Sequence, residues 1–299
     1  MAAVDLHLHS KCSDGTDSPT ELVKKAASAG VGVTALTDHD TVIGVPEFLE
    51  SESALHIKRI AGVEFSVENF EGLKDIDVLA YYPDNGVFMK RFDEIEGVCR
   101  KISEARIDRL RKISTILASD GIKIDPDEIL SGAEGIVGRK HIAISVLKKN
   151  PGVFKTQQEI FDRYLADGCK ADVPISFQFT LKSCADFIRS TGGYAFLAHP
   201  GVSNGKVPDI GKGLRLIKAA LEAGMCGAEA YYLYHKNRPY TGDYAISEEE
   251  NTAICGKYRS FISGLGGYYT AGSDYHGKNK DIKIGECAND GGEWPLSSD

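Results

Sequence analysis

Five of the eight histidines lie in four short polar clusters, and each cluster follows directly after an apolar, β-like run. The clusters are D-L-H-L-H-S at 5–10, T-D-H-D at 37–40, A-H-P at 198–200 and G-S-D-Y-H-G at 272–277. Imidazole and carboxylate groups are the ligands of Zn²⁺, Mn²⁺ and iron. Their recurrence at strand ends across almost the whole chain predicts one polynuclear metal site rather than scattered surface histidines.

Seven apolar runs predict strands, and helical segments such as 209–223 and 247–261 separate the later ones at a spacing typical of β-α units. The expected strands are Val4–Leu8, Val33–Leu36, Ile57–Phe65, Ile76–Tyr81, Tyr194–Ala198, Ala228–Tyr232 and Tyr268–Ala271. A barrel of parallel strands brings the carboxyl ends of its strands together on one face. The sequence therefore predicts an α/β barrel of seven units whose polar strand ends converge.

The middle of the chain departs from this pattern. Apolar residues recur at helical spacing between Phe92 and Leu117, which predicts an amphipathic helix. Shorter helices are expected near 125–130, 141–148 and 156–167, joined by Gly and Pro turns. We therefore expect a barrel built from residues 1–87 and 175–299, and a helical insertion over 88–174 that covers the active site and selects the substrate.

Composition excludes several classes of protein. The formal net charge of -8 argues against long nucleic acid duplexes and anionic membrane surfaces as partners. No run approaches the roughly 20 apolar residues of a membrane-spanning helix, and no signal-peptide pattern precedes the first cluster, so a cytoplasmic protein is expected. The seven cysteines are widely spaced and form no C-x-x-C pair, which argues against a disulfide framework or a thiolate zinc site.

The spacing of the ligand candidates fits a shared site. His7 and His9 are separated by one residue, so on a strand both imidazoles project from the same side. Asp274 and His276 repeat this spacing, and the Gly-Ser before them lets the backbone approach closely. Glu64 follows an apolar run, where its carboxylate either lies exposed beyond the strand or bridges two metals; we favour bridging.

Residues of the S-D-G turn and of T-D-H-D also have interpretations that do not involve metal binding. Asp14 lies in an Asp-Gly turn, where its carboxylate can reach back over the barrel mouth, although this dipeptide is common in turns without any function. His39 is the expected ligand in T-D-H-D. Asp38 or Asp40 could orient its ring through a hydrogen bond, and Thr41 or Asp40 could instead cap the next helix.

The motifs resemble a known family when they are taken in order. D-L-H-L-H-S with S-D-G, then T-D-H-D, G-V-E-F-S, G-R-K-H, A-H-P and G-S-D-Y-H-G look like the polymerase and histidinol phosphatase (PHP) family of metal-dependent phosphoesterases. The G-R-K-H element and the helical insertion resemble the branch that acts on nucleoside phosphates and short RNA. The resemblance implies a distorted seven-stranded β/α barrel that holds two or three divalent ions of manganese, iron or zinc.

The resemblance also implies three groups of metal ligands. These are His7, His9, Glu64 and Asp274; Glu64, Asp77 and His199; and Asp14, His39 and His276. Asp77 departs from the family pattern, because many members have histidine there. A carboxylate favours Mn²⁺ or Fe²⁺ over Zn²⁺. A two-metal enzyme, with Asp77 as an ordinary strand-end residue, is the alternative.

A phosphate substrate needs positive partners in addition to metal ions. Arg139 and His141 in G-R-K-H and Lys170 near the end of the insertion are the candidates, because arginine suits bidentate phosphate binding and lysine supplies a point charge. Glu229 and His235 could reach the substrate from the sixth strand. For Lys170, Glu229 and His235 a solvated surface position is an equally good interpretation.

Tyrosines at the end of the sixth strand also have two interpretations. The faces of Tyr231, Tyr232 and Tyr234 could stack on a nucleobase, or the three side chains could belong to the core and barrel wall.

The expected reaction is hydrolysis of a phosphomonoester or a terminal phosphodiester. The expected substrate is a nucleoside monophosphate, a 3′,5′-bisphosphate or a short 5′-phosphorylated oligonucleotide. Arg139 and Lys170 would hold phosphoryl oxygens, and His199 or His276 would help to protonate the leaving alcohol. The alternatives are a histidinol-phosphate or sugar phosphatase, a metallohydrolase that cleaves amides or lactones, and a nucleotide-binding regulator without turnover.

Overall fold

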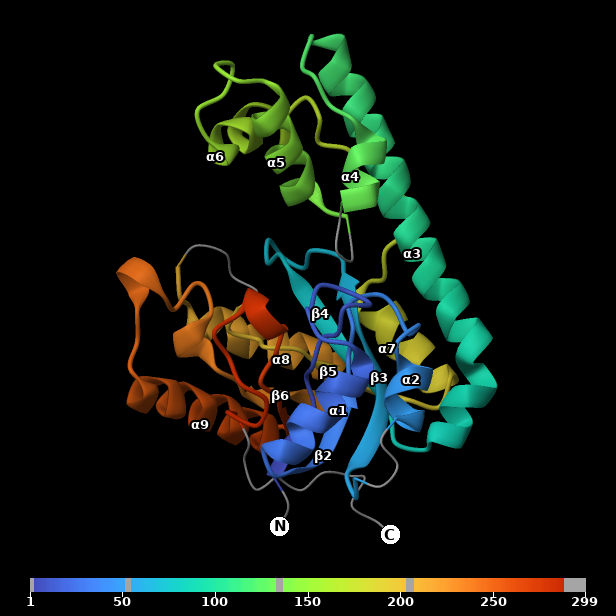
Figure 1. Ribbon diagram of the computed structural model, residues 1–299. Coiled ribbons are helices and arrows are strands. Elements are labelled where there is room, and N and C mark those ends of the chain that lie inside the picture. Colours follow the sequence, from blue (N-terminus) through green and yellow to red (C-terminus); the bar gives the residue numbers. More distant parts are fainter. Residues whose placement is uncertain (1–2, 52–54, 133–136, 203–206, 288–299) are drawn as a thin grey trace. The chain divides into compact units, whose positions relative to one another are not determined.

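The computed structural model describes residues 3–51, 55–132, 137–202 and 207–287 (Figure 1). Within these residues seven strands form one sheet in which neighbours in space are neighbours in sequence. The strands are β1 (Ala3–Asp5), β2 (Val31–Leu36), β3 (Lys58–Val67), β4 (Ile76–Tyr82), β5 (Tyr194–Leu197), β6 (Gly227–Tyr231) and β7 (Tyr268–Ala271). The backbone N–H of Leu6 donates to the carbonyl of Ala271. The sheet is therefore a nearly closed barrel, as predicted.

One strand runs against the predicted direction. β4 pairs antiparallel with both β3 and β5, whereas the other neighbours are parallel. The expectation of seven parallel strands was therefore wrong. Only residues 68–75 connect β3 to β4, and a parallel crossover needs about a dozen residues or more. As a consequence Asp77, near the start of β4, lies at the same edge of the sheet as the carboxyl ends of the parallel strands.

Helices cover the outside of the barrel and form the middle of the chain. The α-helices are α1 (Pro19–Ser28), α2 (Val45–Glu50), α3 (Asn85–Ser119), α4 (Pro126–Gly132), α5 (Arg139–Lys149), α6 (Gln157–Ile160), α7 (Leu181–Ser190), α8 (Ile210–Glu222) and α9 (Glu248–Gly264). Short helical turns are η1 (Phe161–Leu165), η2 (Tyr234–Lys236), η3 (Gly242–Tyr244) and η4 (Gly277–Asn279). Around the barrel, α1, α2, α7, α8 and α9 pack against the strands (Figure 1).

The chain divides into two compact units with separate cores. The first unit is 1–96 with 179–299, and the second is 97–178. Inside the barrel, the cluster is Leu6, Ala35, Ile60, Leu79, Tyr81, Phe196 and Ala198. In the second unit, apolar side chains of α3, α4, α5 and the segment after them form another cluster around Leu110, Ile113 and Ile142. That the helical insertion covers the active site stays a prediction.

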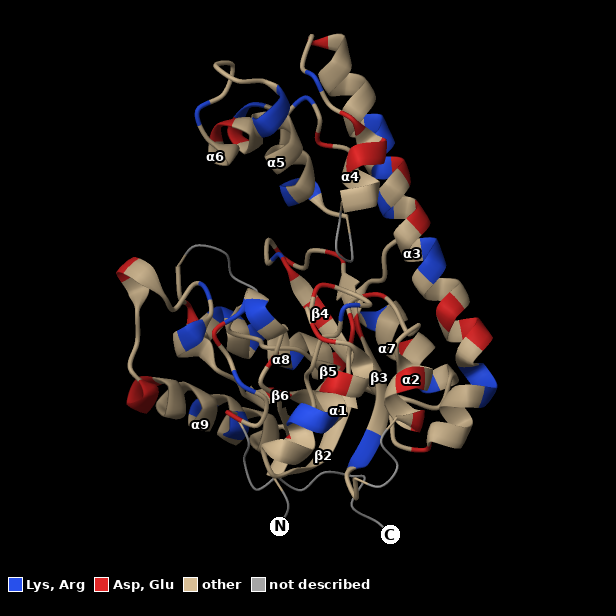
Figure 2. Ribbon diagram, viewed as in Figure 1, with Lys and Arg blue, Asp and Glu red and all other residues tan. Residues whose placement is uncertain are grey.

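The longest helix is amphipathic, as its sequence predicts. Figure 2 shows acidic and basic residues interspersed along α3, while Ile95, Ile102 and Ile113 on this helix are buried. Charged side chains thus occupy solvent-facing positions of α3. No helix among the described residues is both long enough and apolar enough to cross a membrane.

Candidate metal centre

The fold brings all nine predicted ligands into one cluster at the mouth of the barrel. They come from the segments that follow β1, β2, β5 and β7 and from β3 and β4 themselves. Within each of four groups, the possible ligand atoms lie within 4.8 Å of one another. The groups are His9, Asp14, His39 and His276; His7, Glu64 and His199; His7, His9 and Asp274; and His39, Glu64 and Asp77.

Glu64 lies at the centre of the cluster and is fully buried. Its Oε2 atom is 3.1 Å from His7 Nε2, 3.2 Å from His9 Nε2 and 3.2 Å from His39 Nδ1. Its Oε1 atom is 3.1 Å from Nε2 of His199. The two oxygens therefore face different sets of imidazoles, which is the geometry that a carboxylate needs to bridge two ions.

Asp77 joins this cluster through strand pairing. In the antiparallel β3–β4 ladder, Asp77 is paired with Ser66. Because side chains alternate along a strand, Glu64 and Ser66 share one face, and Asp77 opposite Ser66 projects from that same face. The Asp77 Oδ2 atom lies 4.0 Å from His199 Nε2. The antiparallel direction of β4 thus gives this carboxylate access to the site.

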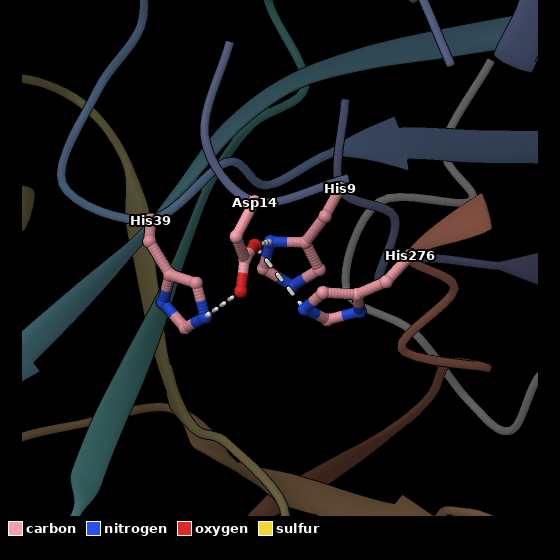
Figure 3. Close-up of side chains that lie close together, drawn as sticks. All are labelled: His9, Asp14, His39 and His276. Carbon is pink, nitrogen blue, oxygen red and sulfur yellow. Dashed lines mark ion pairs between the residues drawn. The ribbon is translucent and has the colours of Figure 1, made fainter. Parts of the chain in front are cut away.

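A second part of the cluster is organised around Asp14. Figure 3 shows its carboxylate pointing toward the rings of His9, His39 and His276. Asp14 Oδ1 lies 3.2 Å from His276 Nε2 and 3.6 Å from His9 Nδ1, and Oδ2 lies 3.9 Å from His39 Nε2. These four residues supply nitrogen and oxygen donors of the kind that transition metals prefer.

Asp38 holds the turn that carries Asp14. Its carboxylate accepts hydrogen bonds from the Ser10 backbone N–H at 2.7 Å, the Ser10 hydroxyl at 2.6 Å and the Ser13 hydroxyl at 2.5 Å. Gly15 is required in the same turn, because a Cβ there would lie 2.2 Å from the carbonyl oxygen of His9. The role found for Asp38 therefore differs from the suggested one of orienting the ring of His39.

Asp274 is held from the side opposite the histidines. Its Oδ1 atom lies 3.3 Å from His9 Nε2, while its Oδ2 atom accepts hydrogen bonds from the Tyr232 hydroxyl at 2.6 Å and from the Lys280 ammonium. Asp274 adopts a left-handed backbone conformation with φ of 56°, which is uncommon for a non-glycine residue. A Cβ on Gly272 would lie 2.2 Å from Cβ of His7, so glycine is required for this close approach.

Glu229 lies behind two of the imidazoles and has no exposed area. Its Oε1 atom is 3.1 Å from Nδ1 of His7, and its Oε2 atom accepts a hydrogen bond from the backbone N–H of His199. Metal-binding histidines commonly donate their second ring N–H to a carboxylate, which fixes the tautomer. This geometry favours an orienting role for Glu229 over the predicted contact with substrate, where two anions would repel each other.

Burial and dense charge shift the acidities in the cluster. Burial raises the pKa of Glu64, but His39, His7 and His199 outweigh it and hold the pKa well below its usual value. Burial and the nearby Glu64 raise the pKa of Asp77 to about 7. For His39, burial dominates and lowers the pKa to about 4. Such strongly shifted groups, concentrated in one place, are typical of functional sites.

The donor set fits divalent ions. Both ring nitrogens of His9 and Nδ1 of His199 are buried without a hydrogen-bond partner among the described residues, although carboxylate oxygens lie within 3.2 to 3.6 Å of the His9 nitrogens. Buried polar atoms normally have partners. Nitrogens that lie close to several oxygens without being aligned to donate to them are expected where an ion is shared between them.

The predicted phosphate ligands of the insertion lie in the second unit. Arg139 donates to the carbonyl of Leu165 at 2.9 Å, and the Lys170 ammonium pairs with Asp120. The Nδ1 atom of His141 accepts a hydrogen bond from the backbone N–H of Gly138 at the start of α5. Contacts of Arg139, His141 and Lys170 with a substrate stay predictions.

The burial of two tyrosines after β6 contradicts the interpretation that they stack on a nucleobase. Tyr232 is 1% exposed and Tyr234 is 0% exposed, so neither ring is available to stack on a nucleobase. The alternative interpretation, core and barrel wall, holds for both. Tyr234 packs against Tyr240 and Tyr258. His235 lies on η2, and its backbone N–H donates to the side chain of Asn251; its contact with substrate stays a prediction.

No pattern in the sequence indicated the contacts that support the ligands. Lys280 and Tyr232 contact Asp274, and Ser10 and Ser13 contact Asp38, through pairings between distant segments. The small polar residues directly after D-L-H-L-H were the one available hint, because a turn of serines beside ligands often accepts or donates hydrogen bonds.

Comparisons with known proteins show which family the sequence matches. The family model described as "PHP domain" matches residues 5–165. A 5′-3′ exoribonuclease of Haemophilus influenzae is 34% identical over 196 residues, which cover 66% of this chain and 68% of the relative. A 3′,5′-nucleoside bisphosphate phosphatase of Chromobacterium violaceum is 28% identical over 280 residues, which cover 92% of this chain and 88% of the relative.

A solved structure shows the same arrangement of elements. A protein from Chromobacterium violaceum, described as an amidohydrolase with bound sulfate and no metal, aligns with a TM-score of 0.66 and 25% sequence identity. The alignment covers 98% of this chain and 92% of that chain. The barrel and the order of its elements are therefore shared with a known structure.

Proposed function

The chain belongs to the PHP domain family, and from this premise we propose that it is a metal-dependent phosphoesterase that acts on nucleotides or short 5′-phosphorylated oligonucleotides. The observation that carries the proposal is the position of Glu64, whose two oxygens face four imidazoles in a buried cluster. The relatives support the substrate class, since one is named for a nucleoside bisphosphate and another for RNA.

We propose that the nine side chains of the buried cluster hold the ions. Divalent ions bound there would supply a water made acidic near neutral pH and positive charge against the phosphoryl oxygens. Glu64 is proposed to bridge two positions. The predicted set is His7, His9, Asp14, His39, Glu64, Asp77, His199, Asp274 and His276. Metal analysis of the purified protein will give the number of bound ions, two or three, and identify them as manganese, iron or zinc.

Two histidines are proposed to move protons. The Nδ1 atom of His276 lies 2.8 Å from the carbonyl of its neighbour Asp274, which leaves Nε2 directed toward Asp14. His199 has its backbone N–H held by Glu229, and its Nε2 faces Glu64. Each imidazole therefore has one nitrogen fixed by a carboxylate or a carbonyl. A fixed ring is suited to protonate the leaving alcohol from a nitrogen that carries a proton and is not bound to an ion.

The other parts of the proposal concern the substrate. Arg139, His141 and Lys170 are proposed to bind phosphoryl oxygens, and His235 is proposed to contact the rest of the substrate. We also propose that the helical insertion selects the substrate and excludes water during the reaction. Glu229 is proposed to orient His7 and His199 instead of contacting substrate.

A substrate screen tests the proposal. Purified protein is assayed for phosphate release from nucleoside monophosphates, nucleoside 3′,5′-bisphosphates, sugar phosphates, histidinol phosphate and 5′-phosphorylated oligonucleotides, in parallel with metal analysis. We expect a nucleotide or an oligonucleotide to give the highest kcat/KM. A sugar phosphate or histidinol phosphate as best substrate would overturn the substrate class, and binding of nucleotides without any turnover would indicate a regulator.

A matched pair of variants controls the screen. Glu64→Gln removes the central charge, and we expect a loss of activity of at least a hundredfold. Glu68→Gln makes the same chemical change at an exposed residue of the same chain segment and should leave activity unchanged. Equal activity of the two variants would remove Glu64 from the mechanism.

A further inference from the structure

A lysine contacts the metal centre from the side that the histidines leave open. Asp274 turns its Oδ1 atom toward His9 Nε2 and His276 Nδ1, at 3.3 Å from each. Its Oδ2 atom instead accepts a hydrogen bond from the ammonium of Lys280. The two oxygens of this one carboxylate therefore face two different kinds of partner, possible metal ligands on one side and a fixed positive charge on the other.

The loop that carries Lys280 is attached to its neighbours by contacts that do not involve the ammonium. The side chain of Asn279 donates a hydrogen bond to the carbonyl of Asp14 at 2.9 Å. The backbone N–H of Lys278 donates to the hydroxyl of Thr16 at 3.0 Å. These contacts join the loop to the turn that follows β1. The position of the loop beside the cluster thus does not depend on the charge of Lys280.

The ammonium of Lys280 compensates a charge that is withdrawn from water. Asp274 is 3% exposed, and removing a carboxylate from water is costly unless a cation or several donors lie against it. The imidazoles near Oδ1 cannot supply this charge when they act as metal ligands, because they bind ions as neutral rings. Lys280 is therefore the permanent positive charge that the chain itself places on Asp274.

The same contact opposes the binding of a divalent ion at the other oxygen. The negative charge of a carboxylate is shared between its two oxygens, so a cation at Oδ2 reduces the charge that Oδ1 offers to an ion. Like charges also repel strongly where water does not screen them. The hydroxyl of Tyr232 donates to the same Oδ2 atom at 2.6 Å but carries no charge. Lys280 thus weakens Asp274 as a ligand in a way that Tyr232 does not.

We infer that Lys280 is an internal counter-ion of Asp274 and lowers the affinity of the metal position formed by His7, His9 and Asp274. The inference rests on the proposed metal centre and distinguishes one of its positions from the others. The side chain of Lys280 is 29% exposed, so its ammonium can move into solvent when an ion binds. We therefore expect this position to fill last and to release its ion first.

Binding of Mn²⁺ to matched variants tests the inference through the direction of the change. Ions are removed from the full-length protein with a chelator, and Mn²⁺ is titrated back by calorimetry. Lys280→Gln should bind one class of Mn²⁺ about tenfold or more tightly than the wild type, with the same number of sites. Lys278→Gln removes the same charge from an exposed position of the same loop and should bind as the wild type does.

The opposite direction would indicate a different role. If Lys280 only held Asp274 in place, Lys280→Gln would bind Mn²⁺ more weakly than the wild type, and this result would overturn the inference, as would unchanged affinity. Lys280→Arg keeps the charge and should keep the wild-type affinity. An Arg variant that binds as tightly as the Gln variant would show that charge is not the cause, and the counter-ion role would be rejected.

A second measurement covers a folding defect. If Lys280→Gln does not fold without ions, as judged by circular dichroism, it is purified with Mn²⁺ and its rate of Mn²⁺ loss to a chelator is compared with that of the wild type. Slower loss supports the inference, and equal or faster loss contradicts it. Wild-type protein that binds Mn²⁺ and hydrolyses nucleotides, with no tighter binding in Lys280→Gln, would reject the counter-ion role alone. Wild-type protein that binds no Mn²⁺ would reject the proposed function as well.

Discussion

The Nδ1 atom of His7 lies 3.1 Å from Oε1 of Glu229, and both side chains are completely buried. The opposite nitrogen of the ring, Nε2, faces Glu64 at 3.1 Å. The imidazole is thus held between two carboxylates, of which Glu64 belongs to the proposed ion-binding cluster and Glu229 supports it. A ring fixed in this way presents its Nε2 lone pair in one direction, which a metal ligand requires.

Replacing the supporting carboxylate should therefore weaken the metal centre. We expect Glu229→Gln to lower metal affinity and kcat about tenfold to a hundredfold, which is the usual effect of losing a partner of a metal-binding histidine. The KM for substrate should change much less. Metal titration and steady-state kinetics measure the two effects. A raised KM with wild-type metal affinity would instead assign Glu229 to the substrate, as the sequence first suggested.

Tyr232 provides a second test of the residues that hold the metal ligands in place. Tyr232→Phe keeps the buried ring and removes only the hydroxyl that donates to Asp274. We expect a loss of about 1 kcal/mol in the free energy of unfolding and a severalfold weaker metal affinity. Because the ring is buried, KM for nucleotides should stay the same. A selective increase in KM for nucleotides would contradict the core position of this side chain.

The status of Asp77 can be decided by counting ions. Asp77→Asn should reduce the metal content by about one ion per chain, because an amide oxygen is a weaker ligand than a carboxylate. Asp75→Asn, two residues earlier and exposed, is the matched control. Elemental analysis after dialysis gives both numbers. Equal metal content in the two variants would remove Asp77 from the ligand set.

Much of the barrel could be predicted from the sequence, because the apolar runs of β1, β2, β5 and β7 are each followed by a polar cluster. The spacing of His7 and His9 placed both imidazoles on one side of a strand, and the same reasoning served for Asp274 and His276. These are local patterns. Convergence of the clusters then followed from the rule that barrel strands end on one face.

The features of the fold and site that could not be predicted depend on pairing between distant segments. The direction of β4 is decided by the length of the link after β3, and a strand pattern looks the same in both directions. The role of Glu229 depends on a contact with His7, which lies 222 residues away.

The link between α1 and the loop that carries His276 should be sensitive to acid. Asp17 accepts hydrogen bonds from Lys25 at 2.7 Å and from the Tyr275 hydroxyl at 2.6 Å. Burial opposes ionisation of Asp17, but these two donors outweigh it and lower the pKa. A lowered pKa means that the stabilisation is complete above the unfolded value of about 4 and disappears as pH falls through the folded value.

Asp17→Asn should therefore reduce the free energy of unfolding by about 1 kcal/mol at pH 7. The difference from the wild type should become smaller as pH falls below about 4, toward the lowered pKa of Asp17. Urea denaturation of both proteins at pH 7 and pH 3 provides the comparison. A difference that is as large at pH 3 as at pH 7 would show that ionisation of Asp17 does not contribute.

The most direct test of the metal centre joins metal content to hydrolysis in one preparation. The protein is purified with Mn²⁺ present, analysed for bound ions, treated with a chelator, and assayed for phosphate release before treatment, after it and after Mn²⁺ is returned. We expect two or three ions per chain, loss of hydrolysis on chelation and recovery with Mn²⁺. Full activity in protein shown to contain no metal would contradict this expectation.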